Sequence, residues 1–169
     1  KVSWEGAFPA NVTPFTKDGD IDEALLRENI RMTVDEGSHG IVVCGHNAEA
    51  HLMTPEERKR IIAISMEEVN GRIPVIAGTG AINTDIVIRQ TRDARDEGAD
   101  GVMIEPPYFM KTKPADSIAH YARITDAVDI PIMVYNVPGR AGVDLTTDVI
   151  EQAAEVSNIC AVKDSCHYF

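Results

Sequence analysis

Short apolar runs alternate with longer amphipathic stretches along the whole chain. The runs lie at residues 6–12, 40–45, 73–78, 101–104, 130–136 and 159–163. Short apolar runs of this kind are typical of strands that are buried on both faces of a sheet. The pattern therefore predicts six short strands.

Between these runs, apolar residues recur at helical spacing. Ile21, Leu25, Ile30 and Val34 follow this spacing, and Gly37 closes the segment. The stretch after Thr54 has the clearest start, because a threonine cap is followed by a proline and by a glutamate placed for a capping box. The helices are predicted over residues 21–36, 54–69, 84–97, 115–127 and 146–156.

Strand and helix alternate six times, which predicts a parallel α/β fold. Counted from Ile41, Val75, Val102, Ile132 and Ile159, successive strand starts are 34, 27, 30 and 27 residues apart. This regularity favours a (β/α)8 TIM barrel. A doubly wound sheet is the alternative, although the first strand lacks the Gly-x-Gly-x-x-Gly loop of a Rossmann fold.

The number of units bears on the domain organisation. A closed barrel needs eight βα units and about 250 residues, whereas these 169 residues supply about six. An open barrel would leave two sheet edges and its interior uncovered. We therefore expect residues 1–169 to be the N-terminal part of a single barrel domain, with the remainder absent.

The net charge bears on the binding partners of the protein, and the cysteines bear on its cellular compartment. Lys and Arg number 16 and Asp and Glu number 27, so the formal net charge is −11. This argues against a nucleic-acid or anionic-membrane partner, and no apolar run is long enough for a membrane span. Cys44, Cys160 and Cys166 lack zinc or disulfide spacing, which favours reduced thiols in a cytoplasmic protein. We expect Cys44 and Cys160 to be buried in strands.

Lys163 is the candidate for chemistry, because it ends the last apolar run. If that run is a barrel strand, its carboxyl end lies on the face where barrel enzymes carry out catalysis. Apolar neighbours favour a neutral amine, which can attack a ketone. Tyr135, at the end of the preceding strand, could then transfer protons. The alternatives are a solvated lysine in a turn and a tyrosine that only packs its ring.

Several motifs stand in a recognisable order: Thr13-Pro14-Phe15, Gly45-His46-Asn47-Ala48-Glu49, Pro106-Pro107-Tyr108-Phe109, Tyr135-Asn136-Val137-Pro138-Gly139-Arg140-Ala141-Gly142 and Val162-Lys163-Asp164-Ser165. With these motifs the chain resembles the dihydrodipicolinate synthase/N-acetylneuraminate lyase family of class I aldolases. The resemblance covers essentially the whole chain. Its most specific part is the Tyr-Asn-x-Pro-x-Arg stretch, with a lysine one βα unit later.

The resemblance implies a Schiff-base-dependent lyase that acts on pyruvate or another 2-keto acid. Lys163 would form the Schiff base, Tyr135 would relay protons and Arg140 would lie near the acidic groups of the substrate. The loop from Gly45 to Glu49, with His46, Asn47 and Ala48, would grip the carboxylate. The resemblance implies a homo-oligomer, a dimer or tetramer. No cofactor beyond the covalent Schiff base is expected.

Two departures argue against dihydrodipicolinate synthase itself. His46 replaces the first threonine of the family loop, and Phe109 replaces a second tyrosine that completes a proton relay across a subunit interface. A phenyl ring cannot relay a proton, whereas a histidine could. These changes favour a pyruvate-type aldolase or a keto-acid dehydratase.

Other readings stay open. The chain could be a catalytically silent paralogue with a binding or regulatory role, dihydrodipicolinate synthase itself, or a phosphate-binding barrel. The spacing of His46, Glu49 and His51 is not that of a zinc helix motif, so no metal site is expected.

Overall fold

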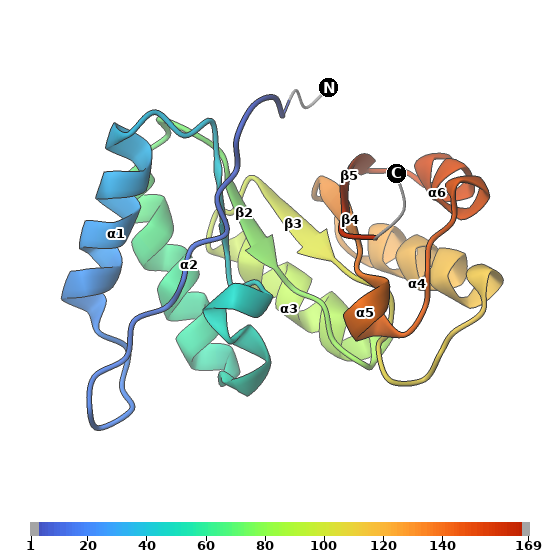
Figure 1. Cartoon of the computed structure of the whole chain (residues 1–169), viewed down its shortest axis with the longest axis horizontal. Coiled ribbons are helices and arrows are strands. Elements are labelled where there is room, and N and C mark those ends of the chain that lie inside the picture. The colour runs from blue at the N-terminus through green and yellow to red at the C-terminus, as the bar shows by residue number, and fades with distance from the viewer. Residues whose placement is uncertain (1–3, 167–169) are drawn as a thin grey trace. The chain divides into compact units, whose positions relative to one another are not determined.

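The computed structural model describes residues 4–166, which form two compact units. The first unit comprises residues 4–78 with Asp93–Gly101, and the second comprises Thr79–Arg92 with residues 102–166. Each unit combines parallel strands with helices (Figure 1). No helix within the described residues has the length and apolar character needed to cross a membrane.

The first unit packs two helices and two strands. In chain order its elements are α1 (Glu23–Asp35), β1 (Ile41–Val43), η1 (His46–Ala48), η2 (Ala50–Leu52), α2 (Pro55–Val69) and β2 (Val75–Gly78). β1 and β2 pair in parallel from Ile41↔Val75 to Val43↔Ala77, and every residue of both strands is buried. α2 contacts both strands, and α1 contacts α2.

The start of α2 follows the prediction from the sequence. The Thr54 hydroxyl accepts a hydrogen bond from the Glu57 N–H at 3.2 Å, and the Glu57 carboxylate accepts one from the Thr54 N–H at 2.7 Å. Both unpaired donors at the helix start are thereby satisfied. Asn70, in the left-handed region with φ 48°, ends the helix. The predicted helix over residues 54–69 is confirmed.

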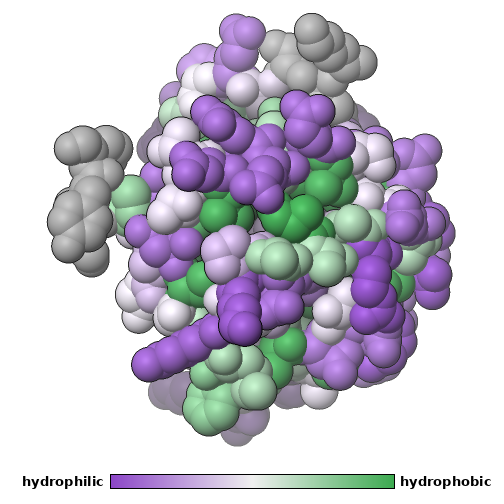
Figure 2. Space-filling view, turned by 90° about the vertical axis from the view of Figure 1, so that its right-hand side faces the viewer, coloured by the Kyte–Doolittle hydropathy of each residue, from purple (hydrophilic) through white to green (hydrophobic). Residues whose placement is uncertain are grey.

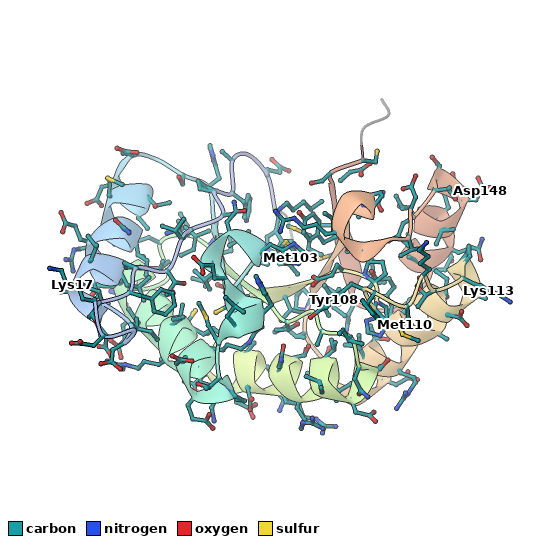
Figure 3. The ribbon with its side chains drawn as sticks, turned by 60° about the horizontal axis from the view of Figure 1, so that its bottom comes forward. Lys17, Met103, Tyr108, Met110, Lys113 and Asp148 are labelled. Carbon is teal, nitrogen blue, oxygen red and sulfur yellow. The ribbon has the colours of Figure 1, made fainter. Side chains whose placement is uncertain are left out.

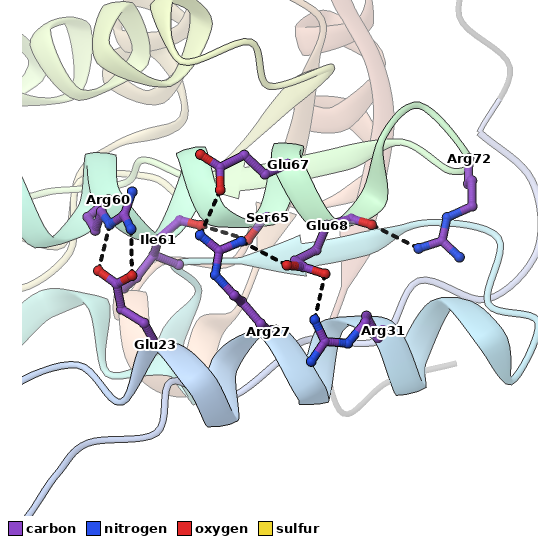
Figure 4. A network of polar contacts seen from close by, with 9 residues as sticks. All are labelled: Glu23, Arg27, Arg31, Arg60, Ile61, Ser65, Glu67, Glu68 and Arg72. Atoms are coloured by element: carbon purple, nitrogen blue, oxygen red, sulfur yellow. Dashed lines mark hydrogen bonds and ion pairs between the residues drawn. The ribbon is translucent and has the colours of Figure 1, made fainter.

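Ion pairs between partly buried and exposed side chains join α1 to α2 (Figure 4). Arg27 reaches both Glu67 and Glu68 at 2.7 Å, and Arg31 reaches Glu68 at 3.0 Å. The hydrogen bond from Arg27, followed by that from Arg31, holds the pKa of Glu68 below its usual value. Ion pairs that keep contact with solvent contribute little stability, whereas the fully buried Leu26 and Ile30 of α1 contribute by burying apolar surface. The ion pairs specify how α1 lies along α2.

The segment predicted as the first strand is only a bridge. Ala10 pairs with Val42, with hydrogen bonds from the Asn11 N–H to the Val42 carbonyl and from the Val42 N–H to the Pro9 carbonyl, each 2.9 Å. Pro9 has no N–H to donate, so the ladder does not extend. The described residues therefore contain five strands rather than the predicted six.

The second unit holds three parallel strands in the order β3-β4-β5. Its elements are α3 (Thr84–Asp96, of which residues up to 92 belong here), β3 (Gly101–Ile104, from residue 102), α4 (Pro114–Ala127), β4 (Ile132–Asn136), α5 (Pro138–Ala141), α6 (Thr147–Ala154) and β5 (Ile159–Asp164). α6 contacts both α4 and β5. The short helix α5 was not predicted from the sequence.

β5 differs from the prediction that it is buried on both faces. Its residues alternate between half-buried and exposed, and Val162 keeps 42% of its surface exposed. Cys160 is exposed, so the prediction that it is buried was wrong. The physical reason is that β5 is an edge strand, paired only with β4 within the described residues. On the side of α4 and α6, hydrophobic surface lies between hydrophilic side chains (Figure 2).

Cys44 lies in the first unit, where the prediction of burial is confirmed. It directly follows β1 and is 2% exposed. Burial raises the pKa of its thiol to about 11, against a small opposing effect of the Arg58 charge.

A buried histidine lies in the core of the second unit. His120 of α4 is 3% exposed, and its Nδ1 lies 2.9 Å from the Thr84 hydroxyl. Its ring meets the ring of Tyr121 edge-on at 5.4 Å between centroids. Burial lowers the pKa of His120 to about 4, although the nearby Glu105 carboxylate opposes the shift. The folded protein therefore holds this imidazole neutral.

We predict that His120 makes the fold acid-sensitive. Because folding lowers the pKa of His120 from its ordinary 6.5 to about 4, the unfolded chain binds the proton more readily, and stability decreases as the pH falls from about 6.5 to about 4. The full loss is about 3 kcal/mol. Urea unfolding across this range should show the slope in the natural protein and a flatter profile in His120→Asn. Substitution of the exposed His51 by Asn is the control, and an unchanged slope in His120→Asn would contradict the prediction.

Candidate active site

Lys163 and Tyr135 lie side by side at the ends of two paired strands. In the parallel ladder Tyr135 of β4 is the register partner of Lys163 of β5. The Lys163 Nζ lies 4.2 Å from the centroid of the Tyr135 ring. Tyr135 is 7% exposed, whereas Lys163 is half-buried. The structure therefore brings together an amine and a phenol at the carboxyl end of the sheet of the second unit.

The geometry of this contact has a chemical consequence. A ring face attracts an ammonium ion, so the ring holds the protonated form of the Lys163 side chain close to β4, and the amine attacks a carbonyl after it loses that proton. The Lys163 amine contacts the ring face of Tyr135, and proton transfer requires the Tyr135 hydroxyl to reach the reacting atoms. The pair supplies both a nucleophile and a neighbouring acid or base, which is the minimum that imine chemistry needs.

Arg140 lies in the same unit, on α5 directly after β4. Pro138 occupies the first position of this helix, and Gly142, with φ 73°, ends it in the left-handed region. The Arg140 side chain is exposed. The helix thus presents a cation from the loop that follows the strand carrying Tyr135.

The predicted carboxylate-binding loop lies in the first unit and directly follows β1. His46, Asn47 and Ala48 form the 3-10 turn η1, which ends at Glu49 in the left-handed region with φ 58°. Ala48 is buried, His46 is half-buried and Asn47 is exposed. The imidazole and the side-chain amide are the hydrogen-bonding groups of this turn.

Arg58 is a buried residue that supports the loop after β1 and that the sequence did not reveal. It lies on α2 and is 7% exposed. Its guanidinium donates to the Ala50 carbonyl at 2.8 Å and also to the Gly78 carbonyl. A buried guanidinium therefore ties the loop after β1 to the end of β2. No local signal marks this arginine, because charged neighbours in a helix usually indicate an exposed face.

The loop after β3 carries the aromatic pair that departs from the family pattern. Tyr108, Met110 and Lys113 are labelled along this loop in Figure 3. Phe109 is 83% exposed and adopts φ 75°, a region that bulky residues rarely occupy. It presents an apolar ring, and not a hydroxyl, at this exposed position.

At the start of this loop, the buried Glu105 carboxylate lies close against Gly80, so a side chain at position 80 would require the carboxylate to move. A Cβ on Gly80 would lie within 2.4 Å of its oxygens. For metals, the described residues contain no group of three or more His, Cys, Asp or Glu side chains that could hold an ion.

Comparison with known proteins shows what the chain is similar to. Residues 3–169 match the dihydrodipicolinate synthetase family. The 4-hydroxy-tetrahydrodipicolinate synthase of Methanosarcina acetivorans is 44% identical over 162 residues, which are 96% of this chain and 55% of that enzyme.

Two solved structures extend this likeness to the fold. The dihydrodipicolinate synthase of Acinetobacter baumannii, solved with pyruvate, has a TM-score of 0.94 and 39% identity over 96% of this chain and 56% of that one. The Clostridium difficile protein CdNal, solved with mannosamine, has a TM-score of 0.93 and 28% identity over 99% of this chain and 58% of that one.

These similarities show the fold class and the family of the chain. The prediction of a parallel α/β fold of the TIM-barrel class is confirmed. The chain belongs to the dihydrodipicolinate synthetase family. It spans about half the length of the curated relatives that it matches.

We predict that Arg58 holds the loop after β1 in place. Arg58→Met would leave the carbonyls of Ala50 and Gly78 without this donor, at a cost of about 2–4 kcal/mol. Arg58→Lys should recover part of the loss, because one ammonium cannot serve both carbonyls with the same fork geometry. Urea unfolding measures both changes. Arg92→Met at an exposed position of α3 is the control, and an equal effect of the two Met substitutions would contradict the role of Arg58.

Proposed function

We propose that the protein is a Schiff-base-dependent lyase or synthase that acts on pyruvate or another 2-keto acid. The observation that carries the proposal is the pairing of Lys163 with Tyr135 at adjacent strand ends. Membership of the dihydrodipicolinate synthetase family supports it, as does the pyruvate bound in the Acinetobacter baumannii relative.

The chemistry follows from an amine meeting a ketone. The Lys163 nitrogen attacks the carbonyl carbon, and loss of water leaves an iminium ion. The iminium withdraws electrons from the adjacent carbon, so that carbon can lose a proton and become a nucleophilic enamine. Tyr135 takes or supplies the protons of these steps. The enamine then adds to a carbonyl partner, or the same steps run in reverse as a cleavage.

The remaining predicted residues bind the substrate in this proposal. The His46 imidazole and the Asn47 amide offer hydrogen bonds to a carboxylate, and the buried Ala48 lets the turn close tightly. Arg140 supplies a cation that suits an acidic substrate. The proposal involves no metal and no cofactor other than the covalent link to Lys163.

The broader setting of the protein is also a proposal. The described chain would be the N-terminal part of one barrel domain, since it covers 55% of its relative. A homo-oligomer, a dimer or tetramer, and a cytoplasmic location stay predictions, as does the lack of nucleic-acid and membrane partners.

Dihydrodipicolinate synthase activity itself is the second candidate. The name of the Methanosarcina acetivorans relative favours it. His46 and Phe109 oppose it, because neither provides the hydroxyl expected at its position. A catalytically silent paralogue is the alternative from another class. The three differ in whether Lys163 forms an adduct and in whether the full chain turns over the co-substrate of 4-hydroxy-tetrahydrodipicolinate synthases.

We predict that pyruvate and borohydride will trap a covalent adduct on Lys163. Mass spectrometry of peptides from the full chain should locate the adduct on that residue alone. Lys163→Arg should abolish it, because a guanidinium does not form the imine, and Tyr135→Phe should slow trapping about 100-fold. Replacement of the exposed Lys113 by Arg is the control. Absence of an adduct with pyruvate and with a panel of larger 2-keto acids would favour the silent paralogue.

A further inference from the structure

Asn136, the last residue of β4, lies at the centre of a hydrogen-bond network. It is 1% exposed. Its Nδ2 donates to Asp144 Oδ1 at 3.0 Å, to Asp164 Oδ1 at 3.1 Å and, more weakly, to the Leu145 carbonyl at 3.4 Å. Its Oδ1 accepts the Leu145 N–H at 3.0 Å. Both ends of this buried amide are therefore occupied, as a buried polar group requires.

The network lies one position beyond the candidate catalytic pair. Asn136 is the register partner of Asp164, just as Tyr135 is the partner of Lys163. The main chain adds a further bond, from the Ser165 N–H to the Asn136 carbonyl at 2.8 Å. The end of the β4–β5 ladder is thus held by side chain and main chain together.

A fixed ladder end matters because the ladder is irregular at its start. Ile132 pairs with Ile159 but Met133 pairs with Ala161, so Cys160 is an extra residue in β5. A shift of one residue in a strand turns every side chain to the opposite face. Lys163 faces Tyr135 only if the register beyond the irregularity is held, and the bond between Asn136 and Asp164 holds it.

The same amide also ties down the segment that follows α5, the helix that carries Arg140. Asp144 and Leu145 follow α5, and the buried Leu145 makes bonds to Asn136 through both its N–H and its carbonyl. The amide also lies between two carboxylates, those of Asp144 and Asp164, and donates to both. A neutral donor in this place offsets their mutual repulsion, whereas a third carboxylate would add to it.

We propose that Asn136 is a positioning residue that sets Lys163 against Tyr135 for imine formation and holds the segment that follows α5. The proposal rests on the Schiff-base function proposed above. Asn136 need not touch the substrate. It acts through the register of β5 and through the loop after α5.

The test compares Asn136→Asp, Asp164→Asn and the double substitution in the full chain. Asn136→Asp removes the donor and adds a carboxylate, so the rate of pyruvate trapping on Lys163 should fall at least about tenfold per folded molecule. The double substitution restores one donor between positions 136 and 164 and the natural number of carboxylates. It should recover most of that rate.

The pH dependence separates positioning from loss of stability. The defect of Asn136→Asp should deepen as the pH rises, because repulsion grows when the added carboxylate ionises. Asn83→Asp is the matched control. Asn83 is an exposed residue at the start of α3, and its side-chain oxygen accepts a hydrogen bond from the Asp85 N–H at 2.8 Å. An aspartate oxygen can accept the same bond. A trapping rate per folded molecule that is unchanged in Asn136→Asp, or not recovered by the double substitution, would overturn the proposal.

A second readout keeps the two proposals distinct. Acetic anhydride acetylates lysine amines without any keto acid. The rate at Lys163 relative to the rate at Lys113 therefore reports how accessible and reactive the Lys163 amine is. If the natural chain traps no keto acid, the Schiff-base function fails, and the acetylation ratio then decides on Asn136. A ratio changed severalfold in Asn136→Asp and restored in the double substitution supports positioning, and an unchanged ratio rejects it.

Discussion

The parallel pairing of β4 with β5 is the constraint on which the candidate active site depends. A lysine and a tyrosine are ordinary residues until a ladder places them opposite each other, and here the register sets Lys163 against Tyr135. β5 is an edge strand within the described residues and carries an irregularity near its start. Its far end is therefore held by specific hydrogen bonds, and the buried amide of Asn136 makes them. Directional bonds achieve this where half-exposed apolar side chains cannot.

In the first unit, a buried polar side chain likewise stabilises the loop that follows β1. There the buried guanidinium of Arg58 reaches the carbonyls of Ala50 and Gly78. Both units thus place one buried polar side chain beside a strand end and use it to order the loop that follows a strand. Loops carry function because they are free to vary in sequence, and a fixed donor inside the fold limits how far such a loop can move.

Local signals in the sequence predicted the parts of the fold that depend on neighbours along the chain. The capping residues Thr54 and Glu57 marked the start of α2, and the structure shows both bonds of the capping box. The prediction of an opening strand was wrong because Pro9 has no N–H to donate to the ladder. The exposed face of Cys160 was missed because an apolar run does not show how many strands will cover it. Arg58 and Asn136 were missed as structural centres because their partners lie in other elements.

The sequence by itself determined the alternation of strand and helix, the family and the position of Lys163 at a strand end. These follow from periodicity, caps and motif spacing, which are local properties. Only the tertiary structure decided the register that brings Tyr135 to Lys163, the contact of the amine with the ring face, and the burial of the Arg58 side chain. Such features depend on which residues come to lie opposite one another across separate elements, and a one-residue difference in pairing reverses them without changing any local pattern.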